Sequence, residues 1–214
     1  MKLSDVHSLN TMVYTDEIPS KHKKRMDIRL NYFENFPIKN FMGNPPSLPS
    51  SSQTKKELLQ LSNIEVDKSF VEETDNVEKY FDSYMKINKL KYSKELIKEL
   101  MDESGSIILK LKYHYNRPRP DQVANHPLVM IKLKSEKPDT AGTPSYPSGH
   151  SAQSLLLANY FSYLYPEHKY NFMALADDIS YARNVGHMHY PSDSKFGIEL
   201  GNELFLYLIK MGKL

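Results

Sequence analysis

Apolar residues recur at intervals of three and four along most of the chain, and this spacing constrains its fold more than any other feature. Such spacing places one apolar stripe on a helix surface, whereas few segments show the period of two that marks a half-buried strand. The sequence therefore predicts an all-α protein, a single-domain helical bundle. Its helices are expected near Thr54, from Val77, through Ile97, after His150, through Phe172 and from about Ser192.

Prolines and glycines indicate where these helices end and how closely they approach one another. Pro118 and Pro120 should end the third helix near Asn116, because proline lacks a backbone N–H and disfavours helical geometry in the residue before it. Gly197 and Gly201 lie four residues apart on the last helix. Without a Cβ, they would let a neighbouring helix come close.

The N-terminal part of the chain lacks this regularity. Residues 1–45 show no clear period, so we assign them to an N-terminal extension without a predicted structure, and residues 46–214 to the helical domain. The basic run at 21–25 (KHKKR) is read as a solvated face in preference to a binding patch. Thr54 and Glu57 have the spacing of a capping box, which predicts that the first helix of the domain begins at Thr54.

Composition excludes several classes of function. The chain has no cysteine, which rules out disulfides, thiolate metal sites and cysteine nucleophiles. Its 28 basic and 26 acidic residues give a net charge of +2, so charge gives no argument for nucleic acid as a partner. The N-terminus lacks the apolar region of a secretory signal, and no run approaches the roughly 18 apolar residues of a membrane span. We therefore expect a soluble, cytoplasmic protein.

A Pro-Ser-Gly-His sequence at 147–150 directly precedes an apolar helix. Ser148 is a natural N-cap for that helix, whose first backbone N–H groups are left to bind an anion. Gly149 would let the backbone approach an oxyanion without a Cβ in the way. The alternative is an ordinary capped helix in which His150 is incidental.

Two cations fall on the apolar stripes of their helices. Arg183 shares its stripe with Ile179, so its charge is directed inward and needs an anion. That anion is either Asp177 or Asp178 in an internal salt bridge, or a bound phosphate. Lys112 lies on the inward side of the third helix, where the alternative to anion binding is extension of its amine to the surface.

An arginine fork that suits two phosphate oxygens follows the third helix, and two arginines could supply it. Arg119 is paired with Lys112 in one register. Arg117 is paired with Lys110 in the other, at the same separation. Spacing alone does not choose between them.

His189 and Asp193 are four residues apart across a turn that contains Pro191. At that distance the carboxylate can accept the imidazole N–H and leave the other ring nitrogen as a neutral nucleophile. His187 offers a different reading, in which a His-x-His pair and Asp193 bind a metal ion. Neither a His-Glu-x-x-His motif nor a carboxylate cluster supports that reading, so we expect no metal.

Taken together, these three segments resemble the phosphatidic acid phosphatase type 2 superfamily, and especially its soluble branch, the bacterial class A non-specific acid phosphatases. Vanadium haloperoxidases share the same site. The family pattern is Lys-x6-Arg-Pro, Pro-Ser-Gly-His and Ser-Arg-x5-His-x3-Asp, and the resemblance covers about residues 94–210. It implies a helical bundle, a homodimer by analogy with the soluble relatives, and Lys112 with Arg119 as the register. Two positions depart from the pattern, since Ala182 replaces a serine and Gly186 stands one place before the family glycine.

The hypothesis that follows is a metal-independent phosphomonoesterase acting on a small phosphorylated substrate through a phosphohistidine. His189 would attack phosphorus while Asp193 orients it, and His150 would protonate the leaving alcohol. The phosphate oxygens would be held by Lys112, Arg119, Ser148, Gly149 and Arg183. No cofactor is expected, and vanadate should inhibit. The loop 121–143 is expected to form the pocket rim that selects the alcohol.

Three alternatives use the same residues. A vanadate-dependent haloperoxidase would hold vanadate as its cofactor, although its relatives are much longer chains. A non-catalytic module would bind phosphate or a phospholipid headgroup without turnover. A membrane lipid phosphatase would need spans that the sequence lacks.

Overall fold

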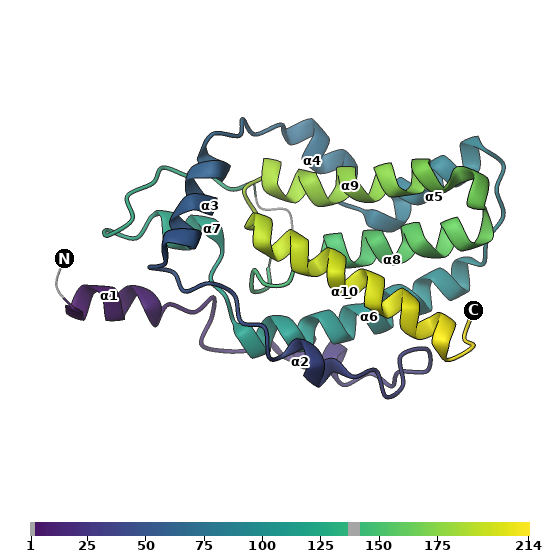
Figure 1. Cartoon of the computed structure of the whole chain (residues 1–214), viewed down its shortest axis with the longest axis horizontal. Coiled ribbons are helices and arrows are strands. Elements are labelled where there is room, and N and C mark those ends of the chain that lie inside the picture. The colour runs from purple at the N-terminus through teal and green to yellow at the C-terminus, as the bar shows by residue number, and fades with distance from the viewer. Residues whose placement is uncertain (1–2, 137–141) are drawn as a thin grey trace.

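The computed structural model describes residues 3–136 and 142–214, and every regular element within those residues is helical (Figure 1). The prediction of an all-α fold is confirmed. Across the same residues, no helix combines the length and the apolar character that crossing a bilayer would require. In chain order the elements are α1 (Leu3–Asn10), α2 (Ser20–Met26), η1 (Ile38–Phe41), α3 (Ser52–Ser62), α4 (Lys68–Thr74), α5 (Val77–Ile87), α6 (Lys94–Tyr115), α7 (Pro120–Ala124), α8 (Gly149–Leu164), η3 (Pro166–His168), α9 (Lys169–Val185) and α10 (Pro191–Lys210).

The centre of the bundle is α8, which packs between α9 and α10 and also contacts α6 (Figure 1). Glycines make the contact with α10 possible. A Cβ built on Gly197 would lie 2.5 Å from the carbonyl oxygen of Ser148, and one on Gly201 would collide with the carbonyl oxygen of Ala152. The predicted close approach is therefore confirmed, and it is a main-chain contact beside the Pro-Ser-Gly-His segment.

The ends of α6 and α3 show one correct and one wrong prediction. The helix α6 ends at Tyr115, as predicted from the following prolines, and its C-cap Asn116 has a left-handed φ of 47°. The helix α3 begins earlier than predicted, because its N-cap is Ser51, whose hydroxyl accepts from the backbone N–H of Thr54 at 3.1 Å. The carboxylate of Glu57 is buried and bonds elsewhere, so the capping box is not formed.

The segment before α3 is attached to α6 along its length. The buried carboxylate of Glu103 accepts backbone N–H bonds from Asn31, Tyr32 and Phe33 at 2.8 to 3.0 Å. Phe33 and Phe36 are buried in a cluster with side chains of α6 and α10. This attachment also brings α2 against α6.

Candidate active site

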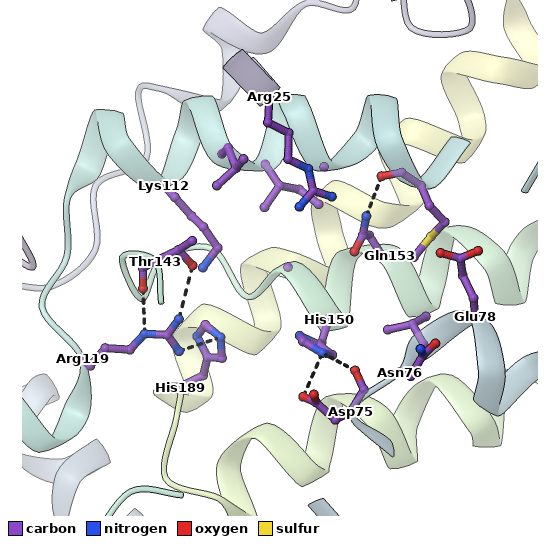
Figure 2. A pocket seen from close by; sticks show the side chains of 16 residues that line it. Arg25, Asp75, Asn76, Glu78, Lys112, Arg119, Thr143, His150, Gln153 and His189 are labelled. Carbon is purple, nitrogen blue, oxygen red and sulfur yellow. Dashed lines mark hydrogen bonds and ion pairs between the residues drawn. The ribbon is translucent and has the colours of Figure 1, made fainter. Parts of the chain in front are cut away.

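A cavity of about 340 Å³ brings together five of the eight sequence-predicted site residues (Figure 2). They come from four places in the chain: Lys112 from α6, Arg119 from the start of α7, Gly149 and His150 from α8, and His189 from the turn before α10. The other three, Ser148, Arg183 and Asp193, are buried behind the cavity lining. Arg183 pairs with Asp75 and Asp193 with His189, both of which line the cavity, and Ser148 bonds Asp193.

The hydrogen bonds of His189 determine which nitrogen carries its proton. Nδ1 lies 3.2 Å from Oδ2 of Asp193, and Nε2 lies 3.2 Å from Nη1 of Arg119. A carboxylate can only accept and a guanidinium can only donate. The imidazole is therefore neutral, with its proton on Nδ1 and its lone pair on Nε2.

Charge and burial keep His189 in that neutral form. Burial lowers its pKa well below the ordinary range, and the positive charges of Arg119 and Lys112 lower it further, against the opposing effect of Asp193. A lowered pKa means that the ring stays deprotonated at Nε2 to a lower pH than an exposed histidine would. The site thus holds an unprotonated imidazole nitrogen, Nε2 of His189, beside Arg119.

Asp193 is fully buried and saturated with hydrogen bonds. Its Oδ2 accepts from the hydroxyl of Ser145 and from the backbone N–H of Tyr190 at 3.0 Å, and its Oδ1 accepts from Nη1 of Arg117 at 2.5 Å. Burial by itself would raise the pKa of Asp193, but Arg117 together with the bonds from His189 and Ser145 holds that pKa below the ordinary carboxyl range. The carboxylate is therefore ionised wherever the site operates.

The structure separates the two candidate arginines. Arg117 is buried between Asp193 and Glu57, 3.4 Å from Oε2 of Glu57, with its guanidinium 3.8 Å from the ring centre of Tyr190. Arg119 lines the cavity instead. Glu57 also accepts the backbone N–H of Ser192 at 2.7 Å. Sequence reasoning missed this carboxylate, since its only pattern was the capping-box spacing.

Backbone carbonyls hold Lys112 and Arg119 in place in the cavity. Lys112 Nζ donates to the carbonyl oxygens of Pro144 and Ser145 at 2.6 and 3.3 Å. Arg119 donates from Nε to Thr143 at 2.9 Å and from Nη1 to Met188 at 2.7 Å. Burial lowers the pKa of Arg119 to about 10 and lowers that of Lys112 well below its usual value. An anion in the cavity would relieve part of this cost of buried positive charge.

Arg183 forms an internal salt bridge, but its partner is neither Asp177 nor Asp178. Its Nη1 lies 2.7 Å from Oδ1 of Asp75, the C-cap of α4, and its side chain is 1% exposed. No sequence pattern pointed to Asp75. Among the described residues nothing accepts a hydrogen bond from the buried Nε of Arg183.

Ser148 and His150 lie at the start of α8. Ser148 is the predicted N-cap: its hydroxyl accepts from the backbone N–H of Ser151 at 3.3 Å, and its own N–H donates to the carbonyl of Asp193 at 3.0 Å. His150 Nε2 lies 2.8 Å from the carbonyl oxygen of Asp75, which can only accept, so Nε2 carries a proton. Burial and the charge of Arg183 lower the pKa of His150, while Asp75 opposes that change.

The stretch from Ala182 to His187 shows how the chain accommodates its departure from the family pattern. Gly186 has an ordinary φ of −78°, and the left-handed conformation belongs to His187, with φ 52°, at the position of the family glycine. The His187 ring contacts two backbone carbonyls, Nδ1 that of Lys134 at 2.9 Å and Nε2 that of Ile64 at 3.0 Å. Both ring nitrogens are thus engaged away from His189, which argues against a His-x-His metal pair.

Residues 137–141 of the loop expected to select the alcohol lie outside the described residues, while its Thr143 lines the cavity. The cavity also contains an arginine from the region to which we assigned no chemistry, Arg25 of α2 (Figure 2). No periodicity in the first 45 residues indicated that contact.

Comparison with known proteins agrees with the motifs. No curated protein matches the chain. A bacterial vanadium-dependent iodoperoxidase of known structure matches with 16% identity and a TM-score of 0.44, over 97% of this chain and 47% of that protein, so the chain spans about half its length. The sequence profile of the PAP2 superfamily matches residues 103–212, a span that includes all three motifs. The chain therefore belongs to the PAP2 superfamily.

Proposed function

We propose that the protein is a metal-independent phosphomonoesterase that works through a phosphohistidine. The observation that carries this proposal is the state of His189, whose Nδ1 proton is held by Asp193 while Nε2 keeps its lone pair beside Arg119 in the cavity. A nucleophilic nitrogen next to fixed positive charge is what attack on a phosphate dianion requires.

The cations and the start of α8 would bind the three non-bridging oxygens. Lys112 and Arg119 line the cavity with Gly149, so positive charge and a helix N-terminus meet there. Arg183 has a buried N–H without a partner in the described residues, and a phosphate oxygen could accept it. These donors would stabilise charge as it develops on the transferring phosphoryl group.

The reaction would take two steps. In the first, His189 Nε2 forms a bond to phosphorus as the bond to the alcohol oxygen breaks, and His150 gives that oxygen a proton. In the second, His150 takes a proton from water, whose oxygen attacks phosphorus and displaces His189 as inorganic phosphate forms. Asp193 stabilises the positive charge on His189 between the two steps.

Because the Nε2 proton of His150 is bonded to Asp75, donation to an alcohol would come from Nδ1 of the protonated ring. Burial lowers the pKa of His150, so the protonated form requires acid conditions. Burial and the charges of Arg119 and Lys112 lower the pKa of His189 well below its usual value, which favours its neutral form. Activity is therefore expected in the acid range.

The test is hydrolysis of an aryl phosphate with and without a metal chelator. We expect activity to survive the chelator, to disappear in His189→Ala, and to be inhibited by vanadate, which mimics the transferring phosphoryl group. Loss of activity with the chelator, or retention in His189→Ala, would refute the mechanism. Halide oxidation by the vanadate-loaded protein would favour a haloperoxidase. Phosphate binding without turnover would favour a non-catalytic binding module.

A further inference from the structure

The cavity contains a cation that none of the three motifs supplies. Arg25 lies in the last turn of α2 and lines the same cavity as Lys112 and His150 (Figure 2). Its guanidinium forms no hydrogen bond or ion pair with any residue in the described ranges 3–136 and 142–214. An arginine can only donate, so this group is available to an anion that enters the cavity.

A glycine on α6 provides the space for this side chain. A Cβ built on Gly105 would lie 2.6 Å from Nη2 of Arg25 and 3.2 Å from its Cζ, so the guanidinium lies directly against the helix backbone. Glycine within a helix is less favourable than alanine. At position 105, however, a side chain with a Cβ would collide with the guanidinium of Arg25.

The position of Arg25 distinguishes it from the phosphoryl site. Gly105 precedes Lys112 by seven residues on α6, which corresponds to about 10 Å along the helix axis. That separation brings Arg25 and Lys112 into the cavity from points about two turns of α6 apart. It suits a second anionic group on the alcohol that His150 would protonate, because His150 also lines the cavity.

We propose that Arg25 determines specificity by binding a second anionic group, a carboxylate or a second phosphate, on the leaving alcohol. This inference rests on the proposed phosphomonoesterase function and names its substrate class: phosphate esters of short acidic alcohols. Gln153 and Asn76, which line the cavity beyond His150, supply polar contacts for the rest of such an alcohol.

The test compares two substrates of similar size, 3-phosphoglycerate and glycerol 3-phosphate, which differ in a carboxylate. We expect the wild-type protein to prefer 3-phosphoglycerate in kcat/KM, and Arg25→Gln to reduce that preference about tenfold, the value of one charge-assisted hydrogen bond. Propane-1,3-diol bisphosphate replaces 3-phosphoglycerate in a parallel series and shows which anion is preferred.

Two further variants separate position from charge. Lys24→Gln removes the same charge from the neighbouring exposed residue and should leave the preference unchanged. Gly105→Ala keeps Arg25 but displaces its guanidinium, so it should lower the preference as Arg25→Gln does. An unchanged preference in Arg25→Gln, or an equal loss in Lys24→Gln, would overturn the proposal.

Binding measurements keep this test separate from the proposed chemistry. If the wild-type protein hydrolyses neither substrate, the phosphomonoesterase proposal fails, but Kd values for the same two compounds can still be measured by calorimetry. Tighter binding of 3-phosphoglycerate that is lost in Arg25→Gln would support the anion site. Equal Kd values in the two proteins would refute it.

Discussion

Replacing Arg117 with methionine should destabilise the protein and alter its response to acid. Arg117 is the cation between two buried carboxylates, 2.5 Å from Asp193 and 3.4 Å from Glu57, which are 0% and 3% exposed. Breaking a buried ion pair by removing one partner costs about 3–5 kcal/mol, because the remaining charge is left without compensation. We expect a loss of that size in the free energy of unfolding at pH 7, measured by urea denaturation.

The pH dependence of this loss follows from Asp193. Its pKa is lower in the folded protein than in the unfolded chain, so its contribution to stability is present above the unfolded carboxyl pKa of about 3.9 and is lost as the pH falls toward the folded value. Arg117 is the strongest of the groups that lower this pKa. The difference in stability between wild type and Arg117→Met should therefore be full at pH 7 and shrink below about pH 4.

The matched control is Lys110→Met, which removes the same charge from the lysine that shares the register of Arg117 in the sequence motif. Lys110 lies on α6, is only partly buried and forms no ion pair in the described residues, so its loss should change the free energy of unfolding by about 0.5 kcal/mol or less. The reasoning is refuted if the two variants unfold at the same urea concentration. It also fails if the effect of Arg117→Met is equal at pH 7 and pH 3.5.

Three further predictions follow from other contacts. Gly201→Ala should lower the free energy of unfolding by about 1–3 kcal/mol, because the new Cβ would overpack against α8. Gly43→Ala is the control: no atom lies within 4 Å of its new Cβ, so the free energy of unfolding should change by about 0.5 kcal/mol or less. Thermal unfolding of the two variants compares them. Asp193→Asn should reduce kcat about 10⁴-fold on an aryl phosphate by removing the acceptor that fixes the tautomer of His189. The pH profile of kcat/KM should fall on its alkaline side as His150 loses its proton, at a pH below the ordinary imidazole range, and a limb above pH 7 would contradict the assigned roles.

The six expected helices (α3, α5, α6, α8, α9 and α10) were predictable because each buries one face, and burial of one face imposes a period that can be read locally. The start of α5 at Val77 followed from the same period, the end of α6 from the prolines after it, and the start of α8 from Ser148 as its N-cap. The start of α3 was not predictable from the sequence, because both Ser51 and Thr54 can cap a helix. The structure uses Ser51, and Glu57, which a capping box from Thr54 would need, is buried.

Residue spacing in the sequence could not predict which side chains of distant segments pair with each other. Asp75 pairs with Arg183 from 108 positions away, and Glu57 bonds Ser192 from 135 positions away. An inward-facing arginine indicates that an anion is needed without indicating which one. Arg25 was missed for a different reason, since a short basic helix has the same composition whether it faces solvent or the mouth of a cavity.

The glycine contact between α8 and α10 fixes two parts of the candidate active site to each other. Main chain touches main chain at Gly197, and the N–H of Ser148 donates to the carbonyl of Asp193, so direct backbone contacts set the spacing between the start of α8 and the start of α10. Motion or sequence drift in the core would thus be taken up by the walls that α6 and α2 contribute. A substitution in those walls can therefore reshape the cavity while the spacing between Ser148 and Asp193 stays constant.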